Sequence, residues 1–378
     1  HTAWVSHALR VREYASKGRG YQAARDINAG EVLITEVPFI AKHGPDALAK
    51  LEAHVAGSML LHHLRPSPNP PLNVSKAGAL ISANAFCLNT TADLAIFQHV
   101  SLLNHSCLPN CSLDLPDGTL SRGHAVVYAS QRIPKGTECT ISFQDQHIML
   151  ATAFRAAFLN SAFGFECVCT RCQGGNEAEH ILHSPSDKMK VLDKEQAMQV
   201  IMAVAVQHCN IVGAGPCEIM HSTNSRNRNS QGTFGFEMAK FDSAAEVVEA
   251  TADFMTFAPY LHVAHWQRNH VRGLRTDALI QMGSSEGKSE ACRLLLESLE
   301  AEAAQLPSHY LPRLRTWQRF KKLLKELPVA EQRDIEMEAT RCNIDYQHLM
   351  CMEAWNTSYH DSHIPLWLKR FLDSNQSF

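Results

Sequence analysis

Three cysteines lie close together in the segment Cys167-Val168-Cys169-Thr170-Arg171-Cys172, which has the spacing C-x-C-x2-C. Thiolates at this spacing are typical ligands of Zn²⁺, and a closed tetrahedral site needs four ligands. The start of the chain has no signal-peptide pattern, so clustered cysteines indicate metal binding rather than disulfides. The cluster therefore predicts three ligands of one metal ion, with three reduced loop thiols as the alternative.

A second informative segment reads Ser-Leu-Leu-Asn-His-Ser-Cys-Leu-Pro-Asn-Cys over residues 101–111. It resembles the Asn-His-Ser-Cys-x-Pro-Asn signature of SET domains. Other segments resemble, in the same order, the cofactor loop, the turn and strand after it, the last SET strand and the post-SET cysteine segment: residues 17–20, 26–33, 133–143 and 165–172. Together, residues 10–175 resemble the SET-and-MYND (SMYD-like) lysine methyltransferases.

The chief departure from that family is the missing MYND zinc finger. Residues 40–86, where relatives insert the finger, contain no cysteine. A short helical segment and the proline-rich linker 65–71 are expected there instead. Any role that relatives assign to the finger is therefore not carried over to this chain.

The resemblance implies the fourth metal ligand and the cofactor. It assigns Cys107 as the fourth sulfur, with Cys111 and Cys87 as alternatives, and the site would pin the post-SET segment across the SET core. It also implies S-adenosylmethionine as methyl donor. The residues expected to bind this cofactor are Gly18, Arg19, Gly20, Asn84, Ser101, Asn104, His105 and Phe165.

The expected catalytic positions lack the hydroxyl groups that the family uses. Methyl transfer to a lysine amine requires alignment and desolvation, and tyrosine hydroxyls usually orient the amine. Here phenylalanine stands at both tyrosine positions, Phe143 and Phe163, with His105 as the third candidate. Loss of one such donor costs a rate factor on the order of 10² or more.

Three functions consequently stay open. The chain is an active protein-lysine methyltransferase in which water or another side chain replaces the tyrosines, or a catalytically weak SET protein that acts as a binding or scaffold subunit. The third alternative is a structural zinc protein that binds neither cofactor nor substrate. The expected partner is a protein substrate or peptide, such as a histone tail or a subunit of a chromatin complex.

The predicted fold class is α+β, with a β-rich SET domain at residues 1–165 and a helical insertion at about 44–86. A post-SET zinc segment at 166–180 and an all-α, TPR-like domain at 185–378 follow, with an irregular bundle as the alternative for the helices. The predicted strands cover 21–24, 31–34, 125–129 and 138–143. The predicted helices cover 46–63, 76–86, 243–257, 260–282, 287–304, 309–327, 330–352 and 363–373, with a loop at 213–232.

Composition limits the partners. The formal net charge of −3 and the isoelectric point near 6.7 give no cationic field for nucleic acid. No apolar run approaches the ~20 residues of a membrane span. We therefore expect a protein of the nucleus, the cytoplasm or both, without direct contact to nucleic acid or membrane.

Overall fold

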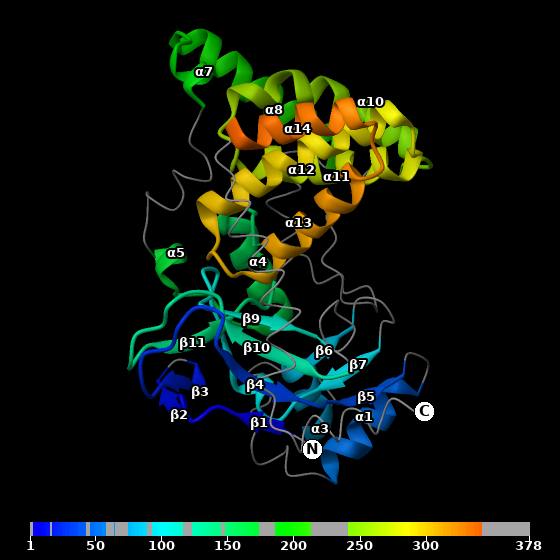
Figure 1. Ribbon diagram of the computed structural model, residues 1–378. Helices are drawn as coiled ribbons and strands as arrows, with labels where there is room; N and C mark the ends of the chain where they lie inside the picture. The colour runs from blue at the N-terminus through cyan, green and yellow to red at the C-terminus, as the bar shows by residue number, and fades with distance from the viewer. Residues whose placement is uncertain are drawn as a thin grey trace.

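The computed structural model describes residues 3–15, 17–42, 46–57, 64, 75–88, 93–115, 123–144, 148–173, 186–212 and 241–341. A β-rich body forms the lower half of the molecule in Figure 1, and a layer of helices covers it. This arrangement confirms the predicted α+β class, with the β-rich part first in the chain. Among the described helices, none combines the length and apolar character that crossing a bilayer requires.

Among the described residues, three small sheets build the β-rich body. The first has the order β1 (Ala3–Val5), β4 (Val32–Glu36), β10 (Ala125–Ala129) and β9 (Cys111–Asp114), all antiparallel. The second has the order β2 (Leu9–Tyr14), β3 (Gly18–Ala23), β11 (Glu138–Ile141) and β8 (Asn104–His105). The third has the order β5 (Phe39–Ala41), β7 (Leu94–Ile96) and β6 (Ala85–Cys87).

The pairing that matters most for the site is the parallel one between β8 and β11. Asn104 lies opposite Thr140 and His105 lies opposite Ile141. Parallel neighbours must come from segments far apart in the chain. This pair therefore sets the Asn-His-Ser-Cys motif beside the strand that leads to Phe143.

In the described part of the insertion between β5 and β6, two short helices pack against each other. Helix α1 (Ala47–Ala56) packs on α3 (Lys76–Asn84) through a core that includes Leu51, Val55 and Leu80. The Ser75 hydroxyl accepts a hydrogen bond from the Gly78 N–H and caps α3. The predicted helix 76–86 was wrong at its end, because Ala85–Cys87 pairs with β7 as strand β6. The predicted helix 46–63 was too long, because α1 ends at Ala56 with Gly57 as its C-cap, and residues 58–63 lie outside the described part.

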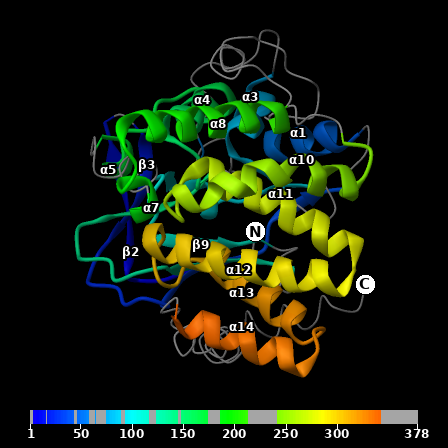
Figure 2. The same cartoon turned by 90° about the horizontal axis from the view of Figure 1, so that it is seen from above.

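The part of the chain after residue 185 is helical where the structure describes it, as predicted. Its described helices are α7 (Asp187–Lys190), α8 (Lys194–Val212), α10 (Ala244–Phe257), α11 (Trp266–Met282), α12 (Ser285–Gln305), α13 (Leu311–Leu324) and α14 (Val329–Arg341). Two helices before it were not predicted: α4 (Thr152–Phe163) and α5 (Thr170–Gln173). The described residues also form two short 3-10 turns, η1 (Val100–Leu102) and η3 (Ala258–Tyr260). In Figure 2, α8, α10, α11 and α12 lie side by side in chain order, which favours a helical array over an irregular bundle.

The structure places the start of one predicted helix at a different residue. The helix expected from residue 260 begins only at Trp266, because Pro259 lies in the 3-10 turn η3 and a turn follows it. The loop 213–232, the helix 363–373 and the end of the helix 330–352 lie outside the described residues. The domain boundaries near 165 and 185 stay predictions, since residues 174–185 also lie outside.

The helical layer packs directly on the first sheet. Val126 and Tyr128 of β10 share one core with Leu314, Trp317 and Phe320 of α13. Polar contacts surround this core: the Leu311 N–H donates to Ser112 Oγ at 3.1 Å, the His309 N–H donates to the Ser130 carbonyl at 3.0 Å, and Arg315 pairs with the buried Asp114 at 3.4 Å. The helices therefore hold the sheet that carries the loop around Cys107.

Candidate functional site: a cysteine cluster beside a polar and aromatic cavity

The structure brings together the four cysteines predicted as metal ligands. The sulfur atoms of Cys107, Cys167, Cys169 and Cys172 all lie within 4.8 Å of one another. Cys107 Sγ is 3.8 Å from Cys167 Sγ and 3.5 Å from Cys172 Sγ. Four sulfurs at ~2.3 Å from a tetrahedral Zn²⁺ would be separated by about 3.8 Å, so the cluster fits that ion.

Of the two alternative ligands, Cys111 is not part of this cluster. Cys111 is fully buried in the SET core, where its thiol hydrogen-bonds with Cys139. The side chain of Cys87 lies outside the described part of the chain. The four sulfurs that converge are therefore Cys107 and the three of the C-x-C-x2-C segment.

Two N–H groups point at the sulfur of Cys107. Gln144 Nε2 lies 3.2 Å from it and His105 Nε2 lies 3.3 Å from it. The Phe143 N–H donates to His105 Nδ1 at 3.0 Å, so this ring nitrogen is the acceptor and Nε2 carries the proton of a neutral imidazole. His105 consequently links the Phe143 backbone to Cys107, and both His105 and Gln144 reach the Cys107 sulfur.

The sulfurs interact strongly with one another. Hydrogen bonding with Cys107 lowers the pKa of Cys169 to about 5, whereas hydrogen bonding with Cys167 raises the pKa of Cys107. Close like charges oppose full ionisation. The cluster therefore shares protons by itself, and a divalent cation would be needed to hold four thiolates together.

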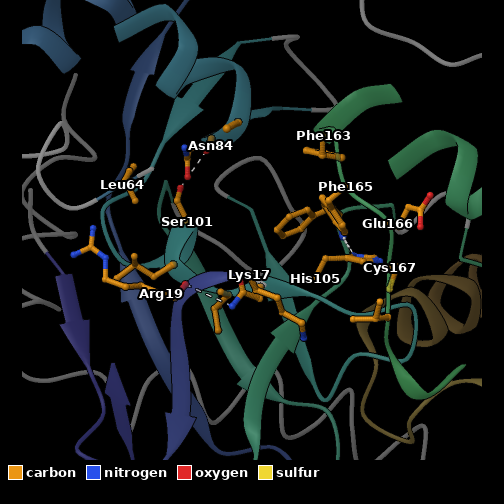
Figure 3. A pocket seen from close by; sticks show the side chains of 16 residues that line it. Lys17, Arg19, Leu64, Asn84, Ser101, His105, Phe163, Phe165, Glu166 and Cys167 are labelled. Atoms are coloured by element: carbon orange, nitrogen blue, oxygen red, sulfur yellow. Dashed lines mark hydrogen bonds between the residues drawn. The ribbon is translucent and has the colours of Figure 1, made fainter. Parts of the chain in front are cut away.

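A cavity of about 280 Å³ lies beside this cluster (Figure 3). Eight residues predicted to serve the cofactor or catalysis line it together: Arg19, Asn84, Ser101, Asn104, His105, Phe143, Phe163 and Phe165. Gly18 and Gly20 do not line the cavity. A Cβ atom on Gly20 would lie 2.4 Å from Asn104 Nδ2, so Gly20 makes room for the Asn104 amide instead.

The polar wall of the cavity contains an ion pair that sequence reasoning missed. Lys17 Nζ lies 2.7 Å from Glu138 Oε2, and Asn104 Nδ2 donates to Glu138 Oε1 at 2.8 Å. Lys17 lines the cavity, and Glu138 holds both Lys17 and Asn104. No local pattern signals this contact, because 121 positions separate Lys17 from Glu138.

The insertion supplies another wall. The Ser101 hydroxyl donates to the Asn84 carbonyl at 3.1 Å, and the Asn84 amide donates to the Leu80 carbonyl at 2.9 Å. Asn84 and Ser101 face each other in Figure 3. The last turn of α3 therefore fixes the segment that enters the Asn-His-Ser-Cys motif.

Aromatic rings form the third wall. The ring centroids of Phe143 and Phe163 are 5.1 Å apart, those of Phe163 and Phe165 are 6.3 Å apart, and His105 lies 5.9 Å from Phe165. None of the cavity residues in the described part is a tyrosine. The hydroxyls of Tyr14 and Tyr21 are engaged elsewhere, with the Tyr21 carbonyl and with His99. The apolar wall consequently lacks a phenol donor.

A comparison with family models matches the SET domain over residues 18–144. The chain carries a SET domain. This match and the relatives below confirm the resemblance drawn from the motifs to the SMYD-like lysine methyltransferases. The matched span holds the Asn-His-Ser-Cys motif, Glu138 and Phe143, whereas Phe163, Phe165 and the cysteine triplet follow it.

Several curated relatives align with parts of this SET domain. The histone-lysine N-methyltransferase SMYD3 of Mus musculus is 31% identical over 108 residues, which cover 28% of this chain and 24% of the relative. The SET domain-containing protein SmydA-8, isoform B, of Drosophila melanogaster is 37% identical over 83 residues, or 22% of this chain and 17% of the relative. The protein-lysine N-methyltransferase SMYD4 of Homo sapiens is 37% identical over 90 residues, or 24% of this chain and 10% of the relative.

Each alignment therefore covers only part of this chain and only part of the relative. This chain spans about a quarter or less of the length of these curated relatives. At the level of the family, the SET domain is related to protein-lysine methyltransferases, a family that uses S-adenosylmethionine.

Proposed function

We propose that this SET domain binds S-adenosylmethionine in the 280 Å³ cavity and acts as a slow protein-lysine N-methyltransferase. The observation that carries the proposal is the convergence of eight motif residues on one cavity beside the four cysteines. When bound, the cofactor supplies a sulfonium methyl group. Lys17, Arg19 and Asn104 would hold its polar parts, and Phe165 would pack against its adenine.

The aromatic wall has a separate role in this proposal. Phe143 and Phe163 exclude water from the entering lysine side chain, which lowers the pKa of its amine and favours the uncharged nucleophile. They donate no hydrogen bond to orient that amine. Missing donors of this type cost on the order of 10² in rate each, so we expect slow turnover.

The same observation favours a second function. A SET domain that keeps its cofactor cavity but has two phenylalanines at the reacting centre suits a binding or scaffold subunit. The partner in either case would be a protein or peptide, and a histone tail or chromatin-complex subunit in the nucleus or cytoplasm is our proposal for it.

We further propose that the cysteine cluster holds one structural Zn²⁺. Its four sulfurs fit the tetrahedral spacing, and two N–H donors reach Cys107. Metal analysis of the purified full chain should find one equivalent of zinc. A folded, metal-free protein that takes up none on addition of Zn²⁺ would refute the metal centre.

The deciding experiment combines calorimetry with methyl transfer. Calorimetric titration with S-adenosylmethionine should show one site, and methyl incorporation into histones and peptide arrays should be slow. Phe143→Tyr restores one hydroxyl and should raise incorporation at least about tenfold. Phe39→Tyr, which adds a hydroxyl on β5 outside the cavity, should leave it unchanged.

Each outcome separates the functions. No binding of S-adenosylmethionine would refute the cofactor site. Binding without transfer, together with no gain in Phe143→Tyr, would refute the enzyme and leave the binding subunit.

A further inference from the structure

Two buried arginines flank the cysteine cluster. Arg155 on α4 has no exposed surface, and Arg171, which lies between Cys169 and Cys172 on α5, is 6% exposed. Arg155 Nη2 lies 3.9 Å from Cys172 Sγ. Arg171 Nη1 donates to the Cys107 carbonyl at 3.0 Å. Each guanidinium therefore touches one of the two segments that supply the sulfurs.

The remaining partners of both side chains are neutral. Arg155 donates to the Leu150 carbonyl and, at 2.7 Å, to Thr152 Oγ1. Arg171 donates to the Ile148 carbonyl at 2.8 Å and to Gln305 Oε1 at 3.3 Å. Across the described residues, neither guanidinium forms an ion pair with a carboxylate.

Two buried like charges without an anion would oppose folding. Arginine stays protonated at neutral pH, and an unpaired buried charge carries a large desolvation penalty. The charged neighbours that act on Arg171 are Arg155, which repels it, and the three cysteines Cys107, Cys172 and Cys169, which attract it. The anion that these arginines require is therefore the sulfur cluster.

The charges match a metal tetrathiolate. Four thiolates around one divalent cation carry a net charge of about −2, and the two guanidinium groups carry +2. Four protonated thiols would leave the arginines uncompensated, whereas four thiolates without a cation would leave an excess of negative charge. Only the loaded cluster is neutral together with Arg155 and Arg171.

We propose that Arg155 and Arg171 are the charge-neutralising residues of a divalent-metal tetrathiolate centre, and that they set its metal affinity. This inference rests on the metal centre proposed above. Arg171 also extends the centre to the helical layer, because Gln305, the last residue of α12, accepts its hydrogen bond and donates to the Ala264 carbonyl at 2.8 Å. Metal loading would thereby favour the docking of α12.

The test measures metal affinity in the full chain by competition between the protein and a chromophoric chelator for Zn²⁺, and separately for Co²⁺. Arg155→Met and Arg171→Met remove one charge each while keeping an unbranched side chain. We expect each to lower metal affinity about 10- to 100-fold, the range for residues that support ligands. Arg155→Lys and Arg171→Lys keep the charge and should stay within about threefold of the unmodified protein.

A matched control is Arg272→Met on α11. Arg272 is 2% exposed but pairs with Glu297 at 3.5 Å, and it is not among the residues that contact the sulfurs. Its loss should lower the melting temperature without changing metal affinity. A methionine variant at 155 or 171 with unchanged affinity would overturn the proposal.

Stability provides a second readout. Arg171→Met should lower the melting temperature more in the metal-loaded protein than in the chelator-treated protein, because the guanidinium has its anion only when metal is bound. If a methionine variant is insoluble, it is refolded from denaturant over a series of Zn²⁺ concentrations. The quantity compared with the lysine variant is the Zn²⁺ concentration at which refolding is half-maximal. A half-maximal concentration equal to that of the lysine variant would contradict the proposal. An unmodified protein that binds no metal would instead refute the metal centre itself.

Discussion

Asn104 lies on β8, where this strand meets β11 and the β3 residues Arg19 and Gly20. Its amide donates to Glu138 Oε1 at 2.8 Å and to the Arg19 carbonyl at 3.5 Å. The orientation of this one amide therefore depends on three segments that are far apart in the chain. It also depends on the absence of a side chain at Gly20.

Gly20→Ala tests that dependence. The new Cβ would lie 2.4 Å from Asn104 Nδ2, so the amide must move. We expect the affinity for S-adenosylmethionine, measured by calorimetry, to fall about tenfold, the effect of one lost hydrogen bond. Gly273→Ala on α11 places its Cβ in open space and should leave the affinity unchanged. Equal affinities in both variants would show that the Asn104 amide does not hold the cofactor.

Glu36 gives a prediction about pH. Burial raises its pKa from the ordinary value of 4.5 to about 6, even though the N–H groups of Val100, Gln98 and His99 donate to its carboxylate. A raised folded-state pKa means that the folded protein binds the proton more tightly than the unfolded chain. The free energy of unfolding therefore falls by about 2 kcal/mol as the pH rises from about 4 to 7.

Glu36→Gln removes this titration. Urea denaturation of both proteins at pH 4 and pH 7 measures the effect. All other titrating groups are the same in the two proteins, so their contributions cancel in the difference. The stability of the unmodified protein relative to Glu36→Gln should decrease by about 2 kcal/mol over this range. A difference that does not change with pH would contradict a raised pKa at this carboxyl.

Sequence patterns predicted some residues of the site and not others. Cys107, the cysteine triplet and the two phenylalanines were predictable because they lie in contiguous motifs. Lys17, Glu138 and Gln144 were not, because each acts through a partner in a distant segment. Arg155 was missed for the same reason, since it lies in a helix whose apolar run gives no signal of a buried charge.

Helix α4 ends next to the cavity, and the turn at its C-terminus positions the phenylalanines of the aromatic wall. Gly164 adopts φ of +74°, and its N–H donates to the Asn160 carbonyl at 2.9 Å. A left-handed residue at this position stops the helix and redirects the chain. Phe163 and Phe165 on either side of Gly164 can then both face the cavity.

Gly164→Ala should disturb that geometry. A Cβ at positive φ costs about 1 kcal/mol, and the strain acts directly on the two phenylalanines. We expect lower thermal stability and weaker binding of S-adenosylmethionine. Gly283→Ala, at φ of +73° after α11, should cost similar stability without affecting binding. Equal binding in both variants would argue against a role for this turn in the site.

Whether a helix or strand could be predicted from the sequence depended on its length and on the periodicity of its apolar residues. Strand β10 was predicted with its observed bounds, because Ala125–Ala129 is a buried apolar run between turns. The strands β1, β5, β6 and β7 have three residues each, too few to show a period. Helix α4 was missed because its sequence, Thr152–Phe163, has apolar residues on all sides rather than an amphipathic stripe.

At the scale of the whole molecule, the core between the first sheet and α13 connects the β-rich body to the helical layer. Val126 and Tyr128 share this core with Leu314, Trp317 and Phe320. A shared core couples the unfolding of both parts. We therefore expect one cooperative transition when far-UV circular dichroism and tryptophan fluorescence are followed in the same denaturant series.

Phe320→Ala tests the coupling. Phe320 is fully buried, so the truncation should cost about 3–5 kcal/mol. Both signals should shift by the same amount to lower denaturant concentration. Lys322→Ala, two residues further along α13, should shift neither signal noticeably. Two separate transitions in either protein would show that the helices and the SET domain unfold independently.

The cavity also determines the order in which the protein can mature during synthesis. Its lining begins at Lys17 and is completed only by Phe163, Phe165 and Val168. A nascent chain synthesised up to the end of β11 contains the described strands. It does not yet contain the phenylalanines at 163 and 165 or the three cysteines at 167, 169 and 172. The cavity and the cysteine cluster would consequently be completed together, only after residue 172 has left the ribosome.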